Sequence, residues 1–171
     1  GGDTSITREE FFAYKMDDRY AAGSNVRKMQ ADLKNVDPKG DAELKAALDL
    51  VASWNGAADM ENRAAALTIF TGQAIMGSQI HGMYDRAKAL VALKETAALL
   101  KTATGRIDPK WSEVSRVARG GKSWPTDGGP DTLRAMYAGG DLAKDKFRSG
   151  RAGDTYVAMA DWAPDGTYTI D

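Results

Sequence analysis

Apolar residues recur at helical spacing through the first two thirds of the chain but not in the last third. This change in periodicity limits the possible folds more than any other feature of the sequence. Leu44, Leu48 and Val51 illustrate the spacing, because positions three and four apart share one face of a helix. The spacing and its flanking cap and stop residues predict helices over about 7–33 with a break near Gly23, 42–54, 59–75, 85–101 and 109–117. The chain is therefore predicted to be mainly α, with five or six helices around Trp54, Leu67 and Phe70 and with 59–75 as the central helix.

Glycine and proline interrupt this pattern after residue 119. The segment 120–140 holds six glycines and two prolines, which predicts a long loop with one or two helical turns at 131–137. Further on, alternation predicts strands at 155–159 and 167–170 around a turn at Pro164-Asp165-Gly166. We expect a helical region over 1–150 with a glycine-rich loop at 120–140, and a β-hairpin over 151–171. A lone hairpin is marginal in water, so this one is expected to be an incomplete part of a larger sheet.

The composition excludes several classes of function. The 171 residues carry 23 Lys and Arg against 24 Asp and Glu, so no basic surface for nucleic acid is expected. The lack of cysteine and the single histidine exclude a disulfide framework, a thiolate nucleophile and a multi-histidine metal site. No apolar run approaches the roughly 20 residues that span a bilayer, so no membrane partner is expected. The start, Gly1-Gly2-Asp3, has neither Met nor a leader pattern, and we expect the chain to be cut from something longer.

Three groups of residues could carry chemistry, and each has an ordinary structural explanation. Gly120-Gly121-Lys122-Ser123 ends like a phosphate-binding loop, but Arg116 stands where such a loop needs a further glycine. His81 could act as a base near a helix end, yet no spacing places a partner beside it, so capping or packing is expected. The pairs Glu9-Glu10 and Asp17-Asp18 diverge around a helix and are expected on solvated faces.

The large aromatic side chains are expected to be core anchors. They are Trp54, Trp111, Trp124, Trp162, Phe11, Phe12, Phe70 and Phe147. From spacing alone we predict no catalytic residue, no cofactor-binding residue, no metal ligand and no cofactor in this chain.

Several stretches, taken in order, resemble the penicillin acylase family of N-terminal nucleophile hydrolases, which includes penicillin, cephalosporin, aculeacin and acyl-homoserine-lactone acylases. The resemblance covers about nine tenths of the chain and lies in the order and spacing of short motifs. They are Thr7-Arg8-Glu9-Glu10-Phe11-Phe12 with Lys15-Met16-Asp17, Leu48 to Gly56 with Asn55 in place of Asp, Ala64-Ala65-Ala66-Leu67, Trp111-Ser112-Glu113-Val114 with Arg119-Gly120, Gly128-Gly129-Pro130-Asp131-Thr132-Leu133-Arg134-Ala135, Gly153-Asp154-Thr155-Tyr156-Val157, and Trp162-Ala163-Pro164-Asp165-Gly166.

The resemblance implies an amidohydrolase that cleaves an acyl-amide bond, for which this chain is an internal region of the large subunit. Family members mature by self-cleavage that exposes an N-terminal Ser, whose amine is the base and whose oxyanion is held by an Asn side chain and a backbone amide. The matched region lies downstream of these groups. Gly1 cannot replace the Ser, and Ser5 has no free amine. The resemblance therefore implies a helical piece with the opening strands of an αββα sheet, inactive alone, periplasmic or secreted, whose partners are the remaining segments or subunits of the acylase.

A stand-alone, non-catalytic helical binding module is the alternative, because long shaped loops in compact domains often carry function. Its recognition surface would be the 120–140 loop. A ligand loop leaves the indole of Trp124 in Trp124-Pro125 partly exposed, whereas a structural connection buries it against the helices.

Overall fold

The fold is mixed α/β. The computed structural model describes residues 5–78, 80, 82–154 and 157–170. Within these residues it has seven helices and six strands: α1 (Arg8–Lys15), α2 (Asn25–Leu33), α3 (Ala42–Ser53), α4 (Ala65–Met76), α5 (Arg86–Thr104), α6 (Trp111–Val114), β1 (Ser115–Arg119), β2 (Lys122–Pro125), β3 (Met136–Gly139), α7 (Leu142–Asp145), β4 (Arg148–Gly153), β5 (Ala160–Trp162) and β6 (Tyr168–Ile170). The expectation of a mainly α chain is therefore too simple, because residues 115–153 contribute a sheet.

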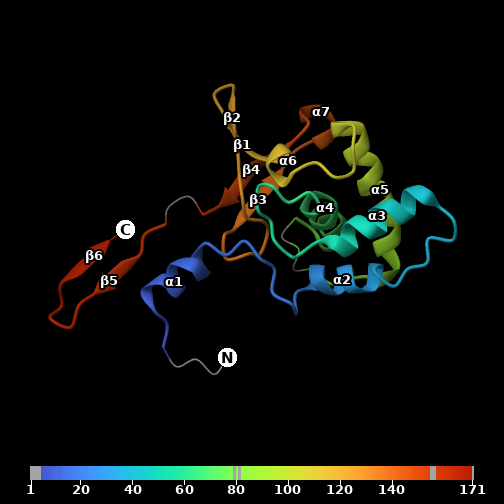
Figure 1. Ribbon diagram of the computed structural model, residues 1–171. Coiled ribbons are helices and arrows are strands. Elements are labelled where there is room, and N and C mark those ends of the chain that lie inside the picture. Colours follow the sequence, from blue (N-terminus) through green and yellow to red (C-terminus); the bar gives the residue numbers. More distant parts are fainter. Residues whose placement is uncertain (1–4, 79, 81, 155–156, 171) are drawn as a thin grey trace.

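Helix α4 lies at the centre of the helical part, with α2, α3 and α5 packed around it (Figure 1). Its residues from Ala65 to Gly72 are all buried, and this confirms the prediction of a central helix. A methyl group added at Gly72 would lie 3.3 Å from the side chain of Val26, so glycine lets α2 approach the α4 backbone closely. None of the helices in the described part of the chain combines the length and hydropathy needed to cross a membrane.

Local capping defines several helix ends where the sequence predicts them. Thr7 and Glu10 form the expected capping box at the start of α1. The carboxylate of Asp41 accepts a hydrogen bond from the Leu44 amide at the start of α3, and Asp85 does the same for Ala87 in α5. Gly105 ends α5 in the left-handed conformation, with φ of 80°. These ends depend only on neighbouring residues, which is why sequence predicts them.

The predicted helix over 7–33 is wrong in its middle. Helix α1 ends at Lys15 and α2 begins at Asn25, so the break near Gly23 extends over the intervening residues. The chain is extended there because its backbone bonds to a distant segment: the Tyr20 amide donates to the Gly56 carbonyl at 2.8 Å. Arg19 also forms an isolated antiparallel bridge with Ala57.

Residues 115–153 form a four-stranded sheet of order β2-β1-β4-β3, where a loop within a helical region was expected. Strands β1 and β2 are antiparallel across Gly120 and Gly121, which both have positive φ and make a two-residue hairpin turn. Strand β1 is parallel to β4, and β4 is antiparallel to β3. The expected helix over 109–117 ends at Val114, and the expected turns at 131–137 are not helical. Pairing with β4, far along the chain, overrides the local helical spacing.

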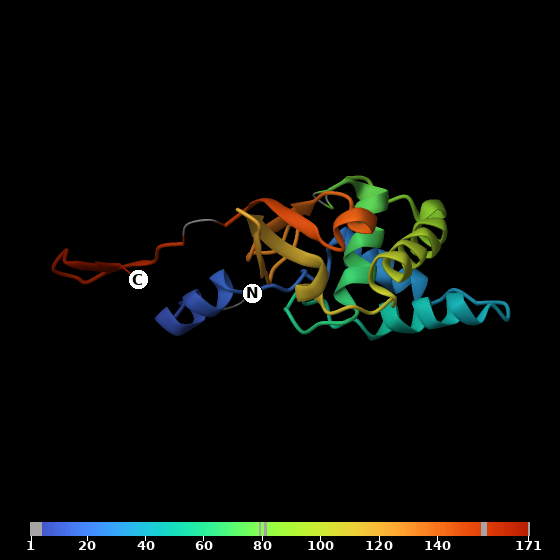
Figure 2. The same ribbon diagram turned by 90° about the horizontal axis from the view of Figure 1, so that it is seen from above.

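The C-terminal hairpin is present but shorter than expected. Strands β5 and β6 pair from Trp162 opposite Tyr168 to Ala160 opposite Ile170, around the predicted turn. Residues 155 and 156 of the expected first strand lie outside the described residues, and 157–159 are not in a strand. The hairpin is a separate two-stranded sheet that projects from the body together with α1 (Figures 1 and 2). Arg8 and Asp161 link α1 to it through an ion pair of 2.6 Å.

Packing of α5 against α4 gives a direct test of the core. Leu93 is fully buried on α5, whereas Val91, two residues earlier, is 57% exposed. Leu93→Ala is expected to lower the free energy of unfolding by about 2–5 kcal/mol, because it leaves a cavity that neighbours fill only in part. Val91→Ala is the matched control and is expected to change it by less than about 0.5 kcal/mol. Urea denaturation measures both, and equal effects of the two variants would contradict this packing.

Candidate functional site

Segments that are distant in sequence meet at one place between the helices and the sheet. The Tyr20 amide bonds to Gly56, the Ala58 amide donates to the Asp18 carbonyl at 3.1 Å, and the Gly128 amide donates to the Ala58 carbonyl at 2.9 Å. We call residues 17–20, 54–58, 111 and 128–134 the motif junction, because all of them fall within or next to the stretches quoted above. The structure thus brings together motifs that local spacing could not connect.

Two buried tryptophans anchor the motif junction through their indole nitrogens. Trp54 donates to the Ala57 carbonyl and Trp111 donates to the Gly128 carbonyl, both at 2.8 Å. Buried Gln30 donates from α2 to the carbonyl of Trp54 at 2.7 Å, and so satisfies the end of α3. Both indoles are core anchors, as predicted, and each also has the partner that a buried N–H requires.

The loop between β2 and β3 requires glycine at two positions for steric reasons. Gly128 has φ of 74°, and a side-chain carbon there would come within 2.0 Å of the Arg134 carbonyl oxygen. A side-chain carbon at Gly129 would lie 2.7 Å from the Tyr20 hydroxyl. The Thr132 hydroxyl accepts from the Gly129 amide at 3.1 Å and closes the loop. The Gly-Gly-x-Asp-Thr pattern is therefore explained by close packing in this fold.

Asn55, which stands where the family pattern has Asp, acts through its side-chain oxygen. That oxygen accepts from the Ala57 amide and from the Asn62 side chain, both at 2.9 Å. A carboxylate oxygen could accept the same two bonds. The departure from the pattern therefore leaves the geometry of this turn intact.

A narrow cleft of about 270 Å³ borders the motif junction. Tyr20, Ser24, Val26, Ile80 and Asp131 are among its lining residues. Tyr20 is only 6% exposed, and its ring lies against Trp54 at 5.4 Å between centroids. Burial, and to a smaller degree the charge of Asp131, raise the pKa of the Tyr20 phenol well above its ordinary value. Its hydroxyl therefore stays protonated at neutral pH.

Two residues that line this cleft carry hydroxyls for which the described part of the chain supplies no hydrogen-bond partner. Among the described residues, no hydrogen-bond partner is found for the Tyr20 oxygen or for the Ser24 oxygen, although both atoms are buried. Ser24 is the N-cap residue of α2, yet its side chain does not cap the helix. Among the described residues, no base contacts the Ser24 hydroxyl.

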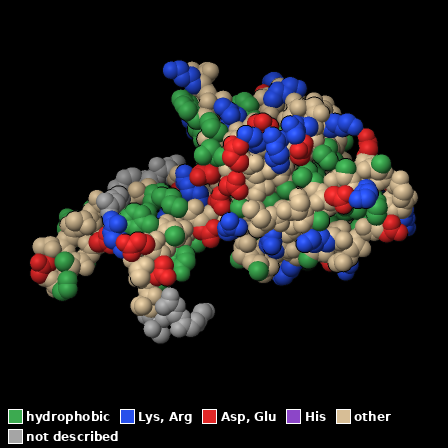
Figure 3. Space-filling view, viewed as in Figure 1, with side chains coloured by type: hydrophobic (Ala, Val, Ile, Leu, Met, Phe, Trp, Pro, Cys, Tyr) green, Lys and Arg blue, Asp and Glu red, His purple; other side chains and the backbone are tan. Residues whose placement is uncertain are grey.

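Carboxylates gather where α1 meets the body of the molecule (Figure 3). Burial raises the pKa of the Asp18 carboxyl, and the negative charge of Asp59 raises it further, while Arg19 opposes the shift. Asp17 instead uses its side chain to accept from the Arg19 amide at 2.9 Å. The expectation that Asp17-Asp18 is a solvated pair on a helix is thus wrong, because both residues follow the end of α1 and are partly buried. The described residues hold no group of three metal-ligating side chains.

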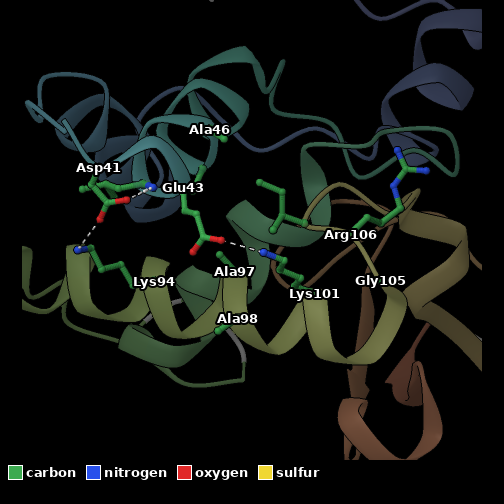
Figure 4. A pocket seen from close by; sticks show the side chains of 12 residues that line it. Asp41, Glu43, Ala46, Lys94, Ala97, Ala98, Lys101, Gly105 and Arg106 are labelled. Carbon is green, nitrogen blue, oxygen red and sulfur yellow. Dashed lines mark hydrogen bonds and ion pairs between the residues drawn. The ribbon is translucent and has the colours of Figure 1, made fainter.

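A second hollow, of about 410 Å³, lies between α3 and α5 (Figure 4). Leu44 and Ala97 contribute to its apolar lining. Two ion pairs cross it: Asp41 with Lys94 at 3.3 Å, and Glu43 with Lys101 at 2.8 Å. Because these charges pair with each other, the hollow presents an apolar gap between helices and no chemical group poised for reaction.

The remaining residues singled out from the sequence lie outside this junction. Gly120-Gly121-Lys122-Ser123 forms the β1–β2 turn and the start of β2, consistent with an ordinary glycine-rich turn. Glu10 belongs to the capping box of α1, and His81 lies outside the described residues. Trp124 and Trp162 are exposed, so the expectation that they are core anchors is wrong. Both sit on strands that border open sheet edges.

The remaining aromatic candidates divide in the same way. Phe70 is buried and packs on Trp111 with ring centroids 5.5 Å apart. Phe11 is exposed on α1, while Phe12 and Phe147 are partly buried. Spacing alone could not distinguish these cases, because the burial of each ring depends on which distant segment packs against it.

Comparisons with known proteins give no further assignment. No family model matches this chain, and no curated protein matches it.

The unpartnered Tyr20 hydroxyl predicts an unusual stability change. Tyr20→Phe removes the hydroxyl and keeps the ring against Trp54, so it is expected to raise the free energy of unfolding of the free chain by about 1 kcal/mol. Tyr137→Phe is the matched control: its hydroxyl donates to Asp131 at 3.2 Å, so its loss is expected to destabilise slightly. Urea denaturation measures both variants. A clear loss of stability in Tyr20→Phe would mean that the hydroxyl has a partner.

The raised pKa of Asp18 predicts a pH dependence of stability. Because the folded-state pKa lies above the unfolded value, the folded chain binds the proton more tightly, and stability falls as pH rises through the folded pKa. Asp18→Asn removes this loss, so its gain in melting temperature is expected to be larger near pH 7 than near pH 3. Glu95→Gln, which removes an exposed carboxylate on α5, is the control. A gain independent of pH would contradict the assignment.

Proposed function

We propose that this chain is a non-catalytic part of the large subunit of an amidohydrolase similar to the penicillin acylases, which cleaves an acyl-amide bond. The observation that carries the proposal is the motif junction. The stretches that resemble the family are spread along the chain, and four of them reach this junction. The Arg134 amide donates to the Asp17 carbonyl at 3.0 Å, the Gly56 carbonyl accepts from the Tyr20 amide, and the Trp111 indole donates to the Gly128 carbonyl. These contacts support treating the stretches as parts of one structural unit.

A fifth family-like stretch is tied to the same region by charge. Lys15 pairs with Asp154 at 2.8 Å, and this hydrogen-bonded contact lowers the pKa of the Asp154 carboxyl. The Asp154 amide also donates to the Ala135 carbonyl at 3.1 Å. The Gly-Asp motif at 153–154 therefore has a defined structural partner in the first helix, which supports reading the motifs as one set.

Within this proposal the chain supplies structure and leaves the reaction to other segments. No residue matches the N-terminal Ser, its amine or the oxyanion Asn of the family. The hairpin β5–β6 would extend a larger αββα sheet, because both of its outer edges are open and Trp162, Tyr168 and Ile170 are exposed on it. A periplasmic or secreted location and an acyl-amide substrate belong to the same proposal.

One observation favours the alternative of a stand-alone binding module. The indole of Trp124 is 51% exposed on the edge strand β2, as expected of a recognition surface and not of a buried connection. In that case the ligand contacts would lie on the β1–β2 hairpin, at the opposite side of the sheet from β3.

Complementation distinguishes the two functions. We expect no hydrolysis of a chromogenic acyl-anilide by the 171-residue chain alone, and activity when it is combined with the other segments of its native precursor. The isolated chain is expected to be inactive because it lacks the nucleophile, and one missing oxyanion donor alone lowers the rate of hydrolysis roughly 10²- to 10³-fold. Trp162→Ala is expected to weaken complementation because it alters the sheet contact. Trp124→Ala is the matched control, also an exposed indole on an edge strand, and is expected to leave activity unchanged.

Two outcomes would contradict the acylase proposal. One is a native precursor, by intact mass, no longer than the chain itself. The other is a combination of all precursor segments that remains inactive. Hydrolysis by the isolated chain that His81→Ala abolishes would overturn the expectation that no catalytic group is present.

A further inference from the structure

The cleft beside the motif junction carries polar groups that the fold does not use. Tyr20 is more than nine tenths buried, and its hydroxyl has no hydrogen-bond partner among the residues that the structure describes. The same holds for the buried oxygen of Ser24, which lines the same cleft. A buried hydroxyl without a partner costs free energy, so two such residues lining one cleft point to a group that binds there.

The first turn of α2 adds donors to the same end of the cleft. The cleft is lined by Ser24, Asn25 and Val26, which are the N-cap and the first two residues of α2. The helix has no side-chain cap and no acidic residue in its first turn. The first amides of a helix have no partner within it and carry partial positive charge. This end of the cleft is therefore suited to an anionic acceptor such as a carboxylate.

The cleft has the opposite charge at Asp131. This carboxylate accepts a hydrogen bond from the Tyr137 hydroxyl at 3.2 Å and lines the cleft. Its charge is close enough to raise the pKa of Tyr20. A simple anion would be repelled by Asp131, and a simple cation would leave the donors at α2 without a partner. Val26 and Ile80 also line the cleft and give it apolar surface.

We propose that this cleft binds a small zwitterion of the α-amino acid class. The ligand's carboxylate accepts hydrogen bonds from the Tyr20 and Ser24 hydroxyls at the start of α2, and its ammonium group pairs with Asp131. The volume of about 270 Å³ accommodates an amino acid with a short aliphatic side chain, which would lie against Val26 and Ile80. The proposal does not depend on the acylase assignment, because no catalytic group takes part in it.

An NMR titration of the full 171-residue chain tests the site. L-Alanine is expected to shift the amide signals of Asn25 and Val26 in a saturable way. Acetate and methylammonium, which each carry one of the two charges, are expected to bind at least about 10-fold more weakly, because each loses one set of charge-assisted contacts. Saturable binding of acetate as tight as that of L-alanine would overturn the zwitterion assignment.

Two variants assign the binding to the hydroxyls. Tyr20→Phe and Ser24→Ala are each expected to weaken L-alanine binding by about 3- to 10-fold, the equivalent of one hydrogen bond. Tyr168→Phe, on the distant hairpin, is the control and is expected to bind normally. Unchanged affinity in both Tyr20→Phe and Ser24→Ala, or no shift in the parent chain at a ligand concentration of about 50 mM, would overturn the proposal. If one variant fails to fold, as judged by circular dichroism, the other decides.

Discussion

The indole of Trp111 joins the helical part of this molecule to its sheet. Trp111 is 1% exposed, its ring packs on Phe70 of α4, and its indole N–H donates to the Gly128 carbonyl in the loop beyond β2. The backbone amide of the same residue donates to Asn62 at 3.0 Å. Because α6 leads directly into β1, these contacts determine where the sheet begins relative to the helices.

Tyr20 also lies beside the loop that begins at Gly128, because its hydroxyl is next to Gly129. Its amide is paired with Gly56, its ring packs on Trp54, and its hydroxyl approaches Gly129 closely enough to exclude any side chain there. The backbone and ring of Tyr20 are thus structural, and only its hydroxyl is left over. Tyr20 can therefore pack in the motif junction through its ring and backbone and also line a cleft.

The surface that another segment would cover and the cleft that would bind a ligand lie in different parts of the molecule. The hairpin β5–β6 and α1 project from the body with exposed aromatic side chains and open strand edges, which are features of surfaces that another segment covers (Figure 2). The cleft at Ser24 lies in the body, is open to solvent, and is lined by both polar and apolar residues. A covering segment would act through strand pairing and apolar contact, whereas the cleft would act through hydrogen bonds and charge.

The sequence by itself determined the parts of the fold that depend on short-range contacts. Asp41 and Asp85 cap α3 and α5, Gly105 ends α5, and α4 is central because it is apolar on all sides. Tertiary structure decided the rest. Val117 fits the helical spacing, yet it lies in β1 because that strand pairs with β4 across a long loop. The cleft likewise joins Tyr20, Ser24 and Asp131 from separate segments. No local pattern specifies such a meeting, because it depends on how the backbone of each segment bonds to the others.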